Sequence, residues 1–205
     1  ANSTSAVRAY IEQYIESTPG GTPYIDPVDS FRIPRAIVKE VFQSHTTIIK
    51  KAAKEFNIDA YTLGAIIIDE IARLMPFEPI FERLGADVVG RNVSVGVAQV
   101  KIDTANDLIQ KGAYNPNPGD KELPFEGQLT NEDRKHLYDY VVQPKHNIRF
   151  AAAFLRYVID FWFEYADLSD MPEILGTLYH QGYGEPKSNP VAIERGEQIA
   201  GEFYG

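Results

Sequence analysis

The most continuously apolar part of the chain lies between residues 59 and 74, and its pattern predicts a buried helix. Because an α-helix turns by about 100° per residue, apolar residues spaced three or four apart share one face. On this face lie Leu63, Ile66, Ile67 and Leu74. Asp59 can cap the start of the helix by accepting hydrogen bonds from its first free N–H groups. Glu70 falls on the same face, where the pattern calls for another apolar side chain.

A carboxylate on such a face needs a physical reason, because an ionised carboxylate is costly to desolvate and apolar surroundings raise its pKa. A carboxyl group still protonated near neutral pH is what a general acid requires. The neighbouring Asp69 lies about 100° around the helix and is expected to form an ordinary surface ion pair with Arg73. Glu70 can also reach Arg73, so the helix alone leaves a catalytic and a structural interpretation of Glu70 open.

Helical periodicity and proline positions divide the rest of the chain. A helix is predicted over residues 4–17, a proline-rich loop over 18–33, and a long helix from Pro34 to about Phe56, with His45 as a core or cleft-wall residue. The valine- and glycine-rich segment 85–100 predicts a short irregular ribbon, and 111–129 a surface loop or lid. Further helices are predicted over residues 103–110, from Thr130 onwards, and over 147–165, 172–181 and 190–203.

These elements predict a mostly α-helical protein with a buried central helix followed by a short irregular or β segment. Residues 1–33 are expected to form an N-terminal helix and connecting loop packed on the body, and residues 34–205 the main domain of a single globular unit. Asn147 falls on the inward face of its predicted helix. An amide there indicates either a helix-start cap or a ligand contact.

Composition narrows the classes of partner. The 205 residues carry a formal net charge of −9, which argues against nucleic acid and anionic membranes as main partners. No apolar run reaches the ~20 residues needed to span a bilayer. The chain has no cysteine, its four histidines lie far apart, and no calcium-loop motif occurs, so we expect no disulfide, no metal and no cofactor.

Four segments, in order, resemble the lysozyme-like catalytic domain of soluble lytic transglycosylases, which are related to goose-type lysozymes. The first is the helix that ends in Glu70. The second is a serine–glycine–glutamine segment, Ser94 to Gln99, followed by Thr104-Ala105. The third is Asn147-Ile148 with Phe154-Leu155, and the fourth is Tyr179-His180-Gln181-Gly182, at the place of a Tyr-Asn-x-Gly signature. The resemblance covers about residues 35–190.

The resemblance implies cleavage of the β-1,4 bond between N-acetylmuramic acid and N-acetylglucosamine in bacterial peptidoglycan. Glu70 would be the general acid and then the base, towards the muramoyl 6-hydroxyl in a lytic transglycosylase or towards water in a muramidase. Asp87 is a possible second carboxylate for a hydrolase, whereas Asp103 is expected to cap the following helix. The implied substrate-binding residues are Ser94, Gly96, Gln99, Asn147, Tyr179, His180 and Gln181, with Tyr179 also bonding to or orienting Glu70.

The chain departs from the family pattern at Ile71, where serine is usual, at His180, where asparagine is usual, and in a longer segment over 112–132. These differences favour, as an alternative, an inactive lysozyme-like module that binds glycan or assists cell-wall assembly. A third hypothesis is an unrelated helical protein with a paired, structural Glu70. The expected partner is the glycan strand of peptidoglycan, in the periplasm or outside the cell, and a protein inhibitor or assembly partner stays open. The chemistry is expected to be that of a transglycosylase by a small margin.

Overall fold

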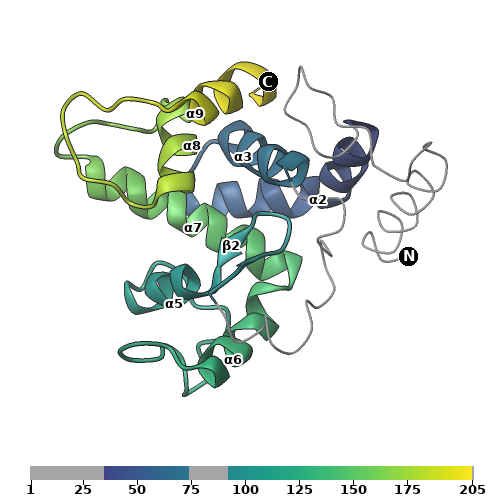
Figure 1. Ribbon diagram of the computed structural model, residues 1–205, viewed down its shortest axis with the longest axis vertical. Helices are drawn as coiled ribbons and strands as arrows, with labels where there is room; N and C mark the ends of the chain where they lie inside the picture. Colours follow the sequence, from purple (N-terminus) through teal and green to yellow (C-terminus); the bar gives the residue numbers. More distant parts are fainter. Residues whose placement is uncertain (1–34, 74–91, 205) are drawn as a thin grey trace, which may run out of the picture.

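The computed structural model describes residues 35–73 and 92–204, with side chains described from Val38 (Figure 1). The predictions for residues 4–17 and 18–33 and for Asp87 lie outside these residues. The described residues form seven α-helices, one two-stranded antiparallel sheet and a final π-helical turn. The elements are α2 (Arg35–Phe56), α3 (Ala60–Arg73), β1 (Ser94–Val95), β2 (Val100–Lys101), α5 (Ile102–Gln110), α6 (Asn131–Val141), α7 (Pro144–Trp162), α8 (Pro172–Gln181), α9 (Glu194–Gln198) and the turn η1 (Ile199–Phe203). The mostly α-helical prediction is confirmed.

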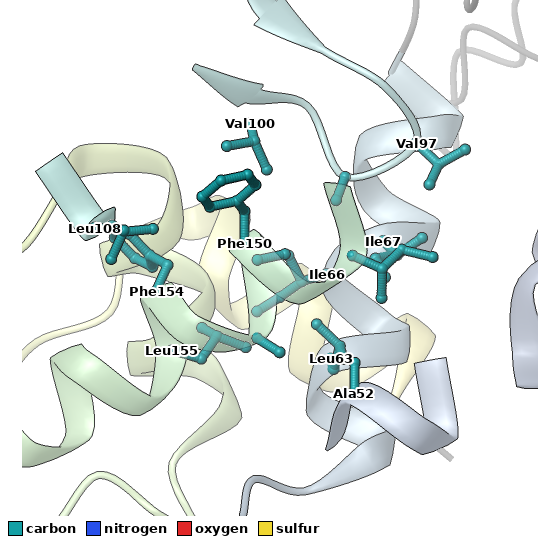
Figure 2. Packing of buried hydrophobic residues seen from close by; sticks show 14 of the residues in the cluster. Ala52, Leu63, Ile66, Ile67, Val97, Val100, Leu108, Phe150, Phe154 and Leu155 are labelled. Carbon is teal, nitrogen blue, oxygen red and sulfur yellow. The ribbon is translucent and has the colours of Figure 1, made fainter. Parts of the chain in front are cut away.

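The core forms where α2, α3 and α7 pack together, with α2 in contact with both of the other helices (Figure 2). Leu63 and Ile67 of α3 and Phe150 of α7 have no exposed surface, and burying a side chain of this size stabilises the fold by about 1.5–3 kcal/mol. Asp59 caps α3 as predicted, because its Oδ2 accepts from the backbone N–H of Thr62 at 2.9 Å.

The predicted ribbon is present in its described part as a hairpin of two very short strands. Ser94 pairs with Lys101 and Val95 with Val100. The turn between them has two residues with positive φ, Gly96 at 76° and Gln99 at 46°. Such a turn is tight, and glycine is the residue that adopts this conformation at least cost.

The segment 111–129 contains no helix or strand, as predicted, and it is anchored at several points. Its Leu123 and Leu129 are buried, and the Asn106 side chain bonds to both the N–H and the carbonyl of Phe125. Thr130 then starts α6 with the expected capping chemistry, a reciprocal pair of hydrogen bonds with Asp133. The segment is therefore a surface loop with an apolar underside.

Three boundary predictions are wrong. The helix α7 begins at Pro144, three residues before the predicted start, because proline suits a first turn that needs no N–H donor, and it ends at Trp162. The last helix begins at Glu194, since the N–H of Ile193 is held by Thr177 Oγ1 at 3.0 Å and the chain before it is extended. Asp103 is not a cap. It lies within the first turn of α5.

The carboxylate of Asp103 instead forms a two-point pair with Arg134 of α6, at 2.8 and 2.9 Å. His45 is a core histidine, as predicted. It is 3% exposed, and its Nδ1 lies 2.7 Å from the carbonyl of Val41. None of the described helices combines the length and the apolar character needed to cross a membrane.

Candidate functional site

Glu70 lies in the last turn of α3, and its side chain is 15% exposed. Arg195 of α9 donates from Nη2 to Glu70 Oε1 at 2.9 Å. The same guanidinium holds Asp69, with Nε 2.7 Å and Nη2 2.6 Å from Oδ2. One arginine thus bridges two successive carboxylates of α3.

The pair between Asp69 and Arg73 exists, with Arg73 Nε 2.7 Å from Asp69 Oδ1. Its predicted surface location is wrong, because Asp69 is only 1% exposed. Asp69 is therefore a buried carboxylate shared by two arginines, Arg73 on its own helix and Arg195 on α9. Removing one partner of a buried ion pair costs about 3–5 kcal/mol, so Asp69 anchors α9 to α3.

Burial raises the pKa of Glu70 to about 7, against the lowering effect of the Arg195 charge, and the neighbouring charge of Asp69 adds to the rise. Arg73 acts in the lowering direction. A carboxyl group with this pKa is present in both forms near neutral pH. Glu70 can then release a proton and take one back, which is the requirement for a general acid that later serves as base.

His180, at the end of α8, contacts the opposite side of the same arginine. Arg195 Nη1 lies 2.9 Å from His180 Nδ1. Because a guanidinium only donates, Nδ1 must accept, and His180 is therefore the neutral tautomer with its proton on Nε2. Burial and the Arg195 charge lower the pKa of His180, which favours the same neutral form.

Tyr179 connects Glu70 with the hairpin turn. Its hydroxyl donates to the carbonyl of Ala98 at 2.5 Å, so in this structure it orients the turn rather than bonding to Glu70. Burial raises the pKa of Tyr179 well above its usual value, and the charge of Glu70 raises it further. Tyr179 is therefore an uncharged residue within the electrostatic reach of Glu70.

Asn147 holds the turn from below. It is fully buried, its Nδ2 donates to the carbonyls of Val95 at 2.7 Å and Val141 at 3.0 Å, and its Oδ1 accepts from the N–H of Ala98 at 2.8 Å. It lies in the fourth position of α7 and is not a helix-start cap. The side-chain amide thus positions the loop, and its predicted contact with substrate stays a prediction.

Gly96 passes directly over this amide. A Cβ added at Gly96 would lie 2.5 Å from Asn147 Cγ, so only glycine fits both the close approach and the positive φ. Gln99 is half-buried, and its Nε2 donates to the carbonyl of Gly96 at 2.8 Å. Gln99 is thereby fixed at the end of the turn, next to a cavity of about 40 Å³ that Tyr179 also lines.

Two predicted residues, Ser94 and Gln181, remain to be placed. Ser94 is exposed at the start of β1. Gln181 is exposed at the end of α8 and lines a second cavity, of about 260 Å³, together with Trp162 and Lys187. The structure therefore gathers Glu70, Tyr179, His180 and the Gly96–Gln99 turn, whereas Gln181 belongs to a separate hollow. Asp87 lies outside the described residues.

Arg195 was missed by the sequence reasoning, because 125 residues separate it from Glu70. The only available signal was Gly196, a glycine inside a predicted helix, which can indicate close packing. A Cβ at Gly196 would lie 2.2 Å from Glu173 O and from Thr177 Oγ1. The missing side chain lets α9 rest directly on α8, and this contact carries Arg195 to the carboxylates of α3.

Within residues 35–73 and 92–204, no group of three or more His, Asp or Glu side chains is arranged to hold a metal ion. No protein-family model matches the chain, and neither a curated protein sequence nor a solved structure matches it significantly.

Proposed function

We propose that this protein cleaves the β-1,4 bond between N-acetylmuramic acid and N-acetylglucosamine in peptidoglycan, as a divergent lysozyme-like enzyme. The observation that supports it most is Glu70, a glutamate near the end of a buried helix whose pKa is raised to about 7. The hairpin turn, whose Ala98 is bonded by both Asn147 and Tyr179, would offer its backbone to a sugar.

In this proposal the protonated carboxyl of Glu70 donates its proton to the glycosidic oxygen, and the bond to the muramoyl carbon breaks. The carboxylate then accepts a proton from the muramoyl 6-hydroxyl, which closes an anhydro ring, or from an attacking water molecule. In the protein without substrate, Arg195 stabilises the ionised form of Glu70, since its Nη2 lies 2.9 Å from Oε1. The Nε2–H of neutral His180 is a donor suited to a sugar hydroxyl.

One observation favours a second candidate, a non-catalytic glycan-binding module of the same class. The ion pair with Arg195 lowers the pKa of Glu70 and opposes its role as an acid. In a catalytically inactive relative this pair would be a permanent structural ion pair, and Glu70 would stay ionised without a proton to transfer.

Digestion of purified sacculi separates the two candidates. Wild type is compared with Glu70→Gln, and with Glu164→Gln as a matched control that changes an exposed glutamate. The enzyme proposal expects wild type and the control to release muropeptides and Glu70→Gln to release none. Products lighter by one water than hydrolysed muropeptides would identify a lytic transglycosylase. Equal release by wild type and Glu70→Gln, or no release by folded wild type, would contradict the proposal.

A further inference from the structure

The ion pair between Glu70 and Arg195 has a geometry in which another carboxylate could replace that of Glu70. We propose that Arg195 is the binding site for a carboxylate of the glycan, and that this carboxylate displaces Glu70 from the guanidinium. The inference deepens the proposed function, on which it rests for the identity of the ligand as a muramic acid residue. It is carried by the donor geometry of Arg195, by the charge balance around Glu70 and by the different burial of the two carboxylates.

Arg195 has more donors than its permanent partners use. Asp69 takes the Nε edge, and Asp69 is buried, so this contact fixes the guanidinium in place. Nη2 also serves Glu70, and Nη1 serves His180. Each terminal nitrogen carries two N–H groups, so Nη1 keeps one N–H besides the one that serves His180. When Glu70 leaves, the N–H of Nη2 that it used is freed next to Nη1, and two neighbouring N–H groups match the two oxygens of a carboxylate.

The two carboxylates differ in how easily they can be replaced. Asp69 is 1% exposed and has a second partner in Arg73, whereas Glu70 is 15% exposed and, within the described part of the chain, its carboxylate bonds only to Arg195. Arg195 itself is 18% exposed. A ligand in solvent can therefore reach the side of Arg195 that Glu70 occupies, but not the side that Asp69 occupies.

Charge balance connects this exchange with proton transfer. Asp69 and Glu70 are acidic, Arg73 and Arg195 are basic, and all four are joined by ion pairs or lie within electrostatic reach of Glu70. The cluster is neutral when Glu70 is ionised and carries one uncompensated positive charge when Glu70 is protonated. A carboxylate from the ligand restores neutrality and so favours protonated Glu70.

The groups on α8 that face the cluster do not disturb this balance. Tyr179 stays uncharged because its pKa is raised, and His180 stays neutral because its pKa is lowered. Lys101 of β2 adds a further positive charge near His180, which also favours an anionic ligand. Binding of an acidic sugar would thus increase the fraction of Glu70 that carries a proton.

The need for a carboxylate indicates which of the two sugars of the glycan would bind to Arg195. N-acetylmuramic acid carries a lactyl carboxylate that N-acetylglucosamine lacks, and in a strand with peptide stems this carboxylate is used up in an amide bond. The inference therefore predicts a preference for muramoyl residues free of peptide. The protein's net charge of −9 gives no long-range attraction for an anion, so this selectivity must come from local contacts.

The test uses the whole protein and two single sugars, N-acetylmuramic acid and N-acetylglucosamine, in NMR titrations. The carboxyl carbon of Glu70, assigned through Glu70→Gln, is followed against pH with and without each sugar. We expect the muramic acid to bind at least about tenfold more tightly, as a two-point charged hydrogen bond allows, and to raise the pKa of Glu70. Equal affinities, or a pKa of Glu70 that does not move, would overturn the inference.

Two variants complete the test. Glu70→Gln should bind the muramic acid more tightly than wild type, because the competing carboxylate is gone, and this gain does not depend on disturbing Arg195. Arg195→Lys should lose the preference for the acidic sugar. Arg134→Gln is the control, because Arg134 also makes two hydrogen bonds to a carboxylate, that of Asp103, and this variant should keep the preference. An unchanged affinity in Glu70→Gln would contradict the exchange.

Failure of the inference is distinguishable from failure of the proposed function. Sacculi left intact by a wild type that still prefers the muramic acid would contradict the enzyme but support the carboxylate site. Release of muropeptides by a protein with no such preference would support the enzyme and overturn the carboxylate site.

Discussion

Replacing Gly96 by alanine tests whether the turn beside Glu70 depends on close contact with Asn147. The new Cβ would lie 2.5 Å from Asn147 Cγ, 2.6 Å from Nδ2 and 2.7 Å from Oδ1, so the amide must move. The backbone at φ 76° adds about 1 kcal/mol of strain for alanine.

The larger part of the cost comes from the hydrogen bonds of the amide. Asn147 makes three of them, at 2.7, 2.8 and 3.0 Å, and it is fully buried. A buried polar group left without a partner costs about 1–3 kcal/mol. With one such group left unpaired and the strain added, we expect Gly96→Ala to lower the free energy of unfolding by about 2–4 kcal/mol.

The chain offers a matched control in Gly112. Its φ is 68°, and no heavy atom of the described residues lies within 4 Å of an added Cβ. Gly112→Ala therefore carries the backbone strain without the collision, and should cost about 1 kcal/mol. Urea unfolding followed by circular dichroism measures both variants.

Equal losses in Gly96→Ala and Gly112→Ala would refute the reasoning. A double-mutant cycle sharpens the result, because Asn147→Ala removes the atoms with which the new Cβ collides. In that background Gly96→Ala should cost only the strain of about 1 kcal/mol.

Three further predictions concern charge and packing. The pKa of Glu70 in the folded protein is raised from 4.5 to about 7, so its stabilising contribution is full below pH 4.5 and is lost as the pH rises through 7. Glu70→Gln cannot ionise, so from pH 4.5 to pH 8 its free energy of unfolding should rise by about 3 kcal/mol relative to that of wild type. Denaturant titrations at the two pH values measure this difference. Gly196→Ala should cost about 2–3 kcal/mol by forcing α9 off α8, whereas Gly201→Ala, which meets no described heavy atom within 4 Å, should be neutral or stabilising. Burial lowers the pKa of His146, so stability should fall as the pH drops below 6.5, and His146→Phe should flatten that slope in thermal melts.

Much of the fold could be predicted because its signals are local. The apolar spacing over 59–74, the cap at Asp59 and the prolines at 34 and 172 each act within one or two helical turns. The structure confirms α2, α3 and α8 to within a residue or two of the expected bounds. The start of the last helix was wrong because a distant side chain holds the preceding residue, Ile193, which Thr177 contacts across 16 residues.

The sequence by itself determined that Glu70 breaks an apolar face and that Asn147 is a polar residue on the inward face of its helix, while Gly96 and Gln99 were singled out by the resemblance. Only the tertiary structure decided what these residues do. Asn147 fixes the hairpin turn by hydrogen bonds, and the buried Asp69 joins α3 to α9 by an ion pair. Both roles involve partners 49 or more residues away in the sequence, so neither could be seen in the local pattern. An ion pair is set by where two helices meet in space, and no periodicity along α3 encodes the arrival of Arg195 beside Glu70.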